Sequence, residues 1–294
     1  MSLGSLEEIR AQCQQHGLPF WEVVLADHLR ETGGGRQEAL ERMARSYQVM
    51  EEADRQYDGS LRSASGLAGG EGAVLEKLAR EGALLSGPFL GRAIARAVKM
   101  GESNACMRRI VAAPTAGACG VLPAVLLTYR QQEGAPLDRM VESLLVAAGI
   151  GQVIAARASL SGAEGGCQAE VGSASAMAAG ALVFLRGGSC QQILDGVAMA
   201  IQALMGLVCD PVAGLVEVPC IKRNVIGTAN AVTCADMALG GLSSPIPADE
   251  TLDAMRAVGR LMPSCLRETA LGGIADTPAG RRLAQEALGE EPSL

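Results

Sequence analysis

The chain has 294 residues, of which 49% are hydrophobic and 2% aromatic, and its formal net charge is −7. A chain of this length can bury a sizeable core, which here must be built from alanine, leucine, valine, isoleucine and methionine. A negative chain without a basic patch interleaved with aromatic residues is unlike nucleic-acid-binding proteins. We therefore expect no nucleic-acid partner.

Two apolar runs raise the question of a membrane. They lie near residues 144–156 and 173–185 and are shorter than the roughly 18–20 residues that a spanning helix needs. Both also contain glycine together with glutamine or serine, so we interpret them as buried helices and expect no membrane association. The first residues carry Glu7, Glu8 and Arg10 and do not resemble an export signal. Nine cysteines then suggest reduced thiols and a cytoplasmic protein.

Helical periodicity recurs along the whole chain, whereas we find no alternating strand pattern and no internal repeat. The pattern predicts an all-α fold in which buried, broken helices pack around a central site, within one domain spanning residues 1–294. The expected helices are two within 5–30, broken at Gly17-Leu18-Pro19, and others at 36–57, 88–100, 136–159, 170–185, 190–207, 222–239, 247–261 and 278–289.

A glycine-rich loop, GSLRSASGLAGGEG, occupies residues 59–72. Its backbone N–H groups and the hydroxyls of Ser60, Ser63 and Ser65 could cradle a carboxylate or a phosphate. It is not a phosphate-binding P-loop, because the terminal Lys-Ser/Thr pair is absent. A plain flexible connector is the competing interpretation, since glycine clusters usually mark loops.

A second interruption lies at residues 104–120, with the sequence NACMRRIVAAPTAGACG. Pro114 and the glycines at 117 and 120 break an otherwise apolar segment. A broken helix in a buried region leaves backbone groups that need partners, and a bound ligand is one possibility. Asn104 and Thr115 are the polar side chains best placed by sequence to take part.

Three cysteines stand at breaks in the apolar pattern rather than within helices. Cys167 follows two glycines, Cys209 precedes Asp-Pro, and Cys220 follows a proline. Such thiols are candidate ligands of a soft metal centre, although buried structural cysteine is the alternative. Their spacing matches neither the dense cysteine run of a ferredoxin nor a zinc knuckle. Only two histidines are present, both near the start of the chain, which argues against a histidine-rich site.

The other cysteines receive a different interpretation. Five lie within helical patterns and are expected to fill the core, namely Cys13, Cys106, Cys190, Cys234 and Cys265. Cys119 is intermediate, because it lies on a glycine-containing loop without an evident partner. If the three turn cysteines bound a [4Fe–4S] cluster, one iron would have no protein ligand and could act as a Lewis acid. That arrangement suits a dehydratase better than an electron carrier.

Several long strings resemble the α chain of the iron–sulfur-dependent bacterial L-serine dehydratases. They are SASGLAGG, NACMRRIVAAPTAGACG, GAEGGCQAEVGSASAMAA, GLVCDPVAGLVEVPCIKRN and LMPSCLRETALGGIADTPAGR. The resemblance implies an all-helical catalytic domain that carries a [4Fe–4S] cluster on Cys167, Cys209 and Cys220. It implies conversion of L-serine to pyruvate and ammonia without pyridoxal phosphate. It also implies a separate β chain, so we expect this chain to be one half of a hetero-oligomer.

Our mechanistic hypothesis has the open iron bind the β-hydroxyl of L-serine while a base removes the α-proton. Glycine-turn hydroxyls can donate to a carboxylate without adding charge, although ordinary loop capping would explain them equally well. The candidate substrate-binding residues are Ser63, Ser65, Gly66, Asn104 and Thr115. Glu164, Glu170 and Lys222 are candidate bases by position. Lys222, Arg223 and Asn224 could instead orient the loop or screen the charge of the cluster. The resemblance suggests that the base is a histidine of the β chain.

Three alternatives predict different properties. A pyridoxal-phosphate lyase would need one of the three lysines, Lys77, Lys99 or Lys222, as its Schiff base. A non-enzymatic iron–sulfur or redox-sensing protein would bind a cluster without turning over serine. A helical scaffold with buried thiols would hold no iron.

Overall fold

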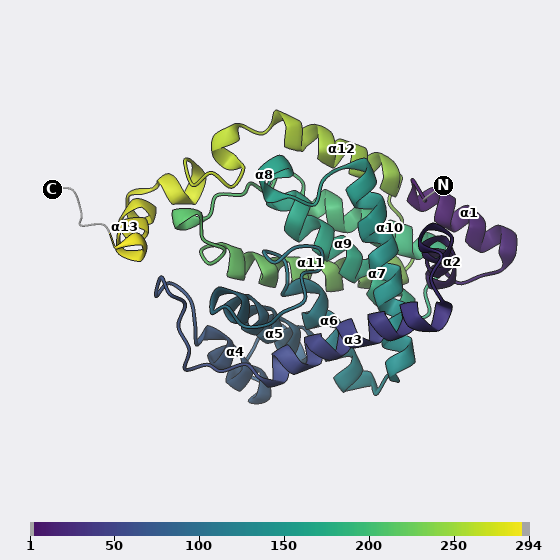
Figure 1. The fold of residues 1–294 in the computed structure, drawn as a ribbon, viewed down its shortest axis with the longest axis horizontal. Coiled ribbons are helices and arrows are strands. Elements are labelled where there is room, and N and C mark those ends of the chain that lie inside the picture. The colour runs from purple at the N-terminus through teal and green to yellow at the C-terminus, as the bar shows by residue number, and fades with distance from the viewer. Residues whose placement is uncertain (1–2, 290–294) are drawn as a thin grey trace.

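The computed structural model describes residues 3–289, and in that range it contains thirteen α-helices and no β-strand (Figure 1). This confirms the predicted all-α fold. The helices are α1 (Leu6–His16), α2 (Phe20–Thr32), α3 (Arg36–Arg55), α4 (Glu71–Arg80), α5 (Gly87–Ala105), α6 (Val121–Glu133), α7 (Leu137–Arg157), α8 (Gly162–Gly165), α9 (Ser173–Leu185), α10 (Cys190–Leu204), α11 (Cys220–Leu239), α12 (Ala248–Leu261) and α13 (Pro278–Leu288).

Helix α9 forms the centre of the molecule. All of its residues are buried, and it packs against α6, α7, α10 and α11 (Figure 1). Alanine, glycine and serine make up most of its sequence, so neighbouring backbones can approach closely. At Gly180 an added Cβ would lie 2.3 Å from Cδ1 of Ile150 in α7. The small side chains of α9 are therefore a packing requirement of the core.

This close packing yields a stability prediction. Gly180→Ala should lower the free energy of unfolding by about 1–3 kcal/mol, because the new methyl group overpacks the contact with Ile150. Gly196→Ala in α10 is a matched control, since its nearest neighbour, Cγ2 of Val183, would lie at an ordinary 3.4 Å. The control should be neutral or stabilising by up to ~1 kcal/mol through helix propensity. Urea denaturation of both variants measures the difference, and equal effects would contradict the packing argument.

Two helical stretches of the chain contain long apolar windows. Helix α7 and the stretch 168–185 are long and apolar enough to cross a membrane by length and composition, so our estimate of the length of these runs was too short. However, 67% and 94% of the two windows are buried against the rest of the chain. Their apolar character is accounted for by the core that they form.

The regular α-helical geometry is interrupted immediately before α9. A single π-helical turn, η1 (Gln168–Gly172), links α8 to α9, and π turns often occur at functional sites. Gln168 fixes this turn, because its Nε2 donates to the carbonyl of Met255 (3.1 Å) and its Oε1 accepts from the N–H of Gly206 (2.8 Å). The buried amide thereby connects η1 to α12 and to the end of α10, and it holds Cys167 at the start of the turn.

The predicted helices agree with the observed ones to within a few residues at most ends, including the break between α1 and α2. Two helices were not predicted, α4 and α6, and both follow glycine-rich loops. The one-turn helix α8, which lies between the predicted helices at 136–159 and 170–185, was not predicted either. The glycine-rich loop 59–70 and the segment 106–120 are irregular, as expected from their glycine and proline content.

Candidate metal centre

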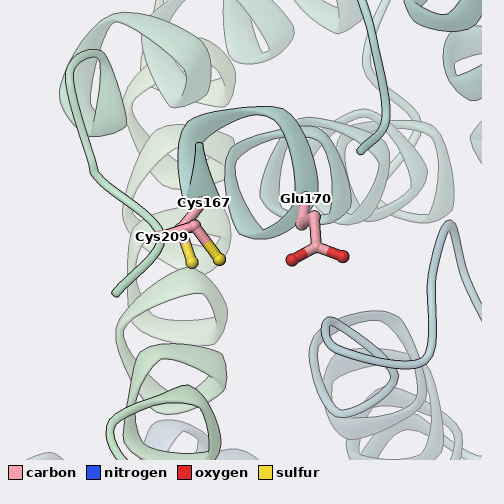
Figure 2. Close-up of side chains that lie close together, drawn as sticks. All are labelled: Cys167, Glu170 and Cys209. Carbon is pink, nitrogen blue, oxygen red and sulfur yellow. The ribbon is translucent and has the colours of Figure 1, made fainter. Parts of the chain in front are cut away.

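Two of the three turn cysteines meet beside a carboxylate. The Sγ atoms of Cys167 and Cys209 and an oxygen of Glu170 all lie within 4.8 Å of one another. Figure 2 shows the two sulfur atoms side by side, with the carboxylate of Glu170 extending from η1. The cysteines are 42 residues apart in the sequence and both are 2% exposed. Their proximity is therefore produced by the fold and not by local sequence.

Cys209 is held in place by the C-terminal part of the chain. Its N–H donates to the carbonyl of Leu266 (2.9 Å), and its carbonyl accepts from the N–H of Glu268 (2.7 Å). These bonds form an isolated parallel bridge with Arg267. The next residue, Asp210, is also buried and accepts from the N–H of Ile274 (2.7 Å). The segment after α12 thus fixes the loop that carries this thiol.

Cys167 lies beside a positive charge. Arg223 of α11 donates through Nη1 to Sγ of Cys167 (3.5 Å) and to the carbonyl of Val208 (2.8 Å). Its Nη2 pairs with Asp210 at 2.7 Å. A hydrogen bond from the Cys209 thiol lowers the pKa of Cys167, and the charge of Arg223 acts in the same direction. The same hydrogen bond raises the pKa of Cys209, so that Cys167 is the more acidic thiol of the pair.

Cys220 faces the same buried region. It is the first residue of α11, and its Sγ lies 4.0 Å from the carbonyl of Leu215. Burial raises the pKa of Cys220 to about 12, and the negative charge of Cys167 adds to the effect. Three residues later, Arg223 reaches Cys167 from the same helix. The structure thus brings Cys167 and Cys209 into contact and leaves Cys220 outside the group within 4.8 Å, although near enough for the charge of Cys167 to act on it.

Glycines leave room for the Glu170 carboxylate. A Cβ at Gly162 would lie 2.8 Å from its Oε2 and 3.0 Å from Sγ of Cys209, and one at Gly117 would lie 3.2 Å from both carboxylate oxygens. Burial raises the pKa of Glu170, and the nearby charge of Glu268 raises it further, whereas a hydrogen bond from Thr115 opposes the shift. Glu170 is therefore a carboxyl group that can hold a proton next to the thiols.

An open cavity of about 460 Å³ gives access to this carboxylate. Thr115, Ser161, Glu170 and Glu268 contribute to its walls. Glu268 was not predicted from sequence; it has a φ of 63°, a left-handed conformation that non-glycine residues adopt only when their surroundings impose it. The cavity can admit a small polar molecule to Glu170.

The glycine-rich loop meets a buried acid. The hydroxyls of Ser63 and Ser65 donate to Oε2 of Glu217 (2.8 and 2.6 Å), and Glu217 is 7% exposed. Glu217 belongs to the loop between Cys209 and Cys220. Gly66 has a φ of 77°, which glycine tolerates best, and its N–H donates to the carbonyl of Ser63 (3.0 Å). The structure therefore brings the serine loop to the cysteine loop, with both hydroxyls engaged by Glu217.

The other predicted polar residues lie along the segment 104–120. Asn104 donates to the carbonyl of Ala116 (3.4 Å), and the Thr115 hydroxyl accepts from the N–H of Ala118 (3.3 Å). Thr115 also lines the cavity beside Glu170. Of this pair, Thr115 has direct access to the cavity, whereas the Asn104 amide supports the fold of the segment.

The candidate bases differ in position. The Lys222 side chain is 69% exposed and pairs with Glu71 at 3.0 Å, so the structure does not bring its amine to the thiols. Glu164 is exposed and contributes to the wall of the cavity. Its carboxylate accepts a hydrogen bond from the Ser159 hydroxyl (2.7 Å). Glu170 alone of the three contacts the cysteine pair.

Sequence reasoning missed Asp210 and Glu217 and gave Arg223 only a general role. The signal for both acids was present, because each is a carboxylate within the apolar string VCDPVAGLVEVPC. Charged residues are seldom fully buried unless they have partners, so acids in such a string indicate a built polar site.

The family model for the serine dehydratase alpha chain matches residues 15–275. The chain belongs to this family. A probable L-serine dehydratase alpha chain of Bacillus subtilis is 44% identical over 91% of this chain and 89% of its own length. The L-serine dehydratase alpha chain of Peptoniphilus asaccharolyticus is 39% identical over 98% and 99%. An L-serine dehydratase of Helicobacter pylori is 44% identical over 60% of this chain and only 39% of its own length.

Family membership supports an enzyme of the ammonia-lyase type. The two relatives that align over nearly their full length are named as alpha chains. The Helicobacter relative is much longer than the segment it shares with this chain.

Among the remaining cysteines, Cys190 at the start of α10 has a distinctive environment. A hydrogen bond from Cys13 lowers the pKa of Cys190 to about 7, and the charge of Arg10 contributes. By contrast, burial raises the pKa of Cys106. Both residues are partly exposed.

We therefore expect iodoacetamide to modify Cys190 before Cys106 at neutral pH, because the thiolate is the reactive form. The Cys190 rate should rise roughly tenfold from pH 6 to 8, through its pKa, whereas the Cys106 rate should still be low at pH 8. Peptide mass spectrometry at timed quenches measures both rates. Faster modification of Cys106 at pH 7 would contradict the assignment.

Proposed function

We propose that this chain is the α subunit of an iron–sulfur-dependent L-serine dehydratase, which converts L-serine to pyruvate and ammonia without pyridoxal phosphate. Membership of the serine dehydratase alpha chain family supports the reaction. The observation that carries the iron–sulfur part is the buried contact of Cys167 and Cys209 with Glu170, all within 4.8 Å. Cys220, buried at the start of α11, is the third proposed ligand.

The donor set suits a [4Fe–4S] cluster. Thiolates are the usual ligands of such clusters, Cys167 and Cys209 lie together, and Cys220 is also buried. The guanidinium of Arg223 against Cys167 would favour the anionic ligand and offset the negative charge of a cluster. When bound, the cluster would supply an iron with a free coordination position, a Lewis acid for the β-hydroxyl of the substrate.

The residues of the chain would then position the substrate and handle its proton. L-serine would occupy the open cavity, with Thr115 as a hydrogen-bond donor at its wall. Glu170, whose pKa is raised by burial, would give a proton to the departing β-hydroxyl, so that water leaves. Loss of the α-proton to a base yields 2-aminoacrylate, which tautomerises and hydrolyses to pyruvate and ammonia. We assign that base to the β chain, because Lys222 lies away from the thiols.

Mixing the two purified chains tests whether the α chain holds the cluster and the β chain supplies the base. Anaerobically reconstituted α chain should contain about four iron atoms and be inactive alone, and addition of purified β chain should restore pyruvate formation from L-serine. Full activity of the α chain alone would contradict a base on the β chain. A chain that takes up no iron would contradict the cluster.

The lysines weigh against a pyridoxal-phosphate lyase. Lys99 is buried and pairs with Asp54 (2.8 Å) and Glu76 (3.1 Å), while Lys77 and Lys222 are exposed and pair with glutamates. None of the three contributes to the cavity that contains Glu170. An aldimine absorption band on addition of pyridoxal phosphate would favour that alternative. If the chain bound a cluster but did not turn over L-serine even with the β chain, the alternative of a non-enzymatic, redox-sensing protein would be favoured.

A further inference from the structure

A second cavity, of about 410 Å³, lies between α8 and α12. Three arginines line it, Arg256 and Arg260 on α12 and Arg267 on the segment that follows. Within residues 3–289, none of the three forms a salt bridge with a carboxylate. Such a concentration of positive charge is unexpected in a chain with a net charge of −7. We call this the α8–α12 cavity.

Arg267 gives the second observation. Its Nε is buried and has no hydrogen-bond partner among the described residues. A buried donor without a partner is unfavourable, and more so when the group is charged. Residue 267 is also the one that bridges to Cys209, so the backbone of this residue is held in place. The Arg267 side chain lines the cavity without a carboxylate partner among the described residues, and an anionic ligand could supply one.

A carboxylate also borders the cavity. Glu164 lines both the α8–α12 cavity and the cavity at Glu170, as do Ala158 and Ser159, so the two spaces adjoin. Three guanidinium groups against one carboxylate still leave a net positive lining. The lining thus carries both positive and negative charge. A ligand with an ammonium and a carboxylate could place its ammonium at Glu164 and its carboxylate at the arginines.

We propose that the α8–α12 cavity binds a small organic carboxylate, either a 2-oxo acid or an amino acid. The planar guanidinium presents paired donors that match the two oxygens of a carboxylate. A volume of about 410 Å³ exceeds the need of a bare inorganic ion and suits a small molecule. This site shares Glu164 with the cavity at Glu170, and it does not depend on the iron–sulfur proposal.

Titration calorimetry of the iron-free full-length chain tests the site with pyruvate and L-serine as probes. Pyruvate or L-serine should bind saturably, and Arg267→Gln or Arg260→Gln should weaken that binding at least tenfold. Arg55→Gln is the matched control, because Arg55 is exposed on α3, forms no ion pair in the described chain and lines neither cavity. It should leave binding unchanged. Near-ultraviolet circular dichroism of each variant establishes that it is folded, and Arg260 is itself exposed.

Glu164→Gln distinguishes the two carboxylate sources. Loss of this negative charge should tighten pyruvate binding, and it should weaken L-serine binding if the ammonium pairs with Glu164. Binding of either carboxylate that is sensitive to Arg260 and Arg267 supports the proposal. Binding of inorganic phosphate without either carboxylate, binding that all arginine variants leave intact, or no binding at all would overturn it.

Discussion

Cys209→Ala should abolish iron binding and, with it, the conversion of L-serine to pyruvate in the presence of the β chain. After anaerobic reconstitution, iron should fall from about four atoms per chain to below about one, because two thiolates do not retain such a cluster. Turnover should fall by at least about a thousandfold, since the chemistry depends on the metal. Iron analysis and pyruvate formation measure the two effects.

Cys119→Ala provides the matched control. Cys119 is equally buried, at 1% exposure, but its thiol faces the carbonyl of Met100 (3.7 Å) and not the cysteine pair. The control should retain both iron and activity while losing a small amount of stability. Equal iron content in Cys209→Ala and Cys119→Ala would show that the contact of Cys167 with Cys209 has no role in metal binding.

Glu170→Gln should separate metal binding from turnover. We expect iron content to be unchanged, because the thiols remain, and kcat to fall by about 10²–10⁴-fold, the usual range for loss of a positioned proton donor. The amide has nearly the same shape and fits between the same glycines, but it cannot transfer a proton. Steady-state kinetics with the β chain, together with iron analysis, measures both quantities.

Lys222→Met is the comparison for that variant. Lys222 is exposed and its partner is Glu71, so its removal should change kcat by less than about twofold, as for an ordinary surface ion pair. A large loss of activity in Lys222→Met with normal activity in Glu170→Gln would reverse our assignment. Loss of iron in Glu170→Gln would instead make Glu170 a ligand.

The helical fold was largely predictable because the residues that begin and end its helices stand next to those helices in the sequence. Gly17 adopts a left-handed conformation at the end of α1, and Pro19 precedes α2, so the sequence marks that boundary directly. The Ser189 capping box marks the start of α10 in the same way. Helices α4 and α6 were not predicted, because the glycine-containing segments before them were interpreted as possible ligand-binding loops.

The candidate site was predictable only in part. Glycine and proline neighbours singled out Cys167, Cys209 and Cys220, and two of these thiols do lie together. The groups that hold them come from distant segments: Arg223 reaches Cys167 across 56 residues, and Leu266 fixes Cys209 across 57. No local pattern encodes such contacts, because they depend on how the helices pack.

The serine loop illustrates the same limit. Ser63 and Ser65 were singled out as donors to an anion, and their hydroxyls do donate to a carboxylate, but it belongs to Glu217 of the chain itself. Sequence could identify the hydrogen-bonding capacity of the loop but not its partner 152 residues away.

Mössbauer spectroscopy of the anaerobically reconstituted chain, with its β chain and with or without L-serine, tests the central claim most directly. The account predicts a [4Fe–4S] signal in which the environment of one iron in four changes when L-serine is added, because that iron has no cysteine ligand. A signal that L-serine leaves unchanged, or a protein that holds no iron, would contradict it.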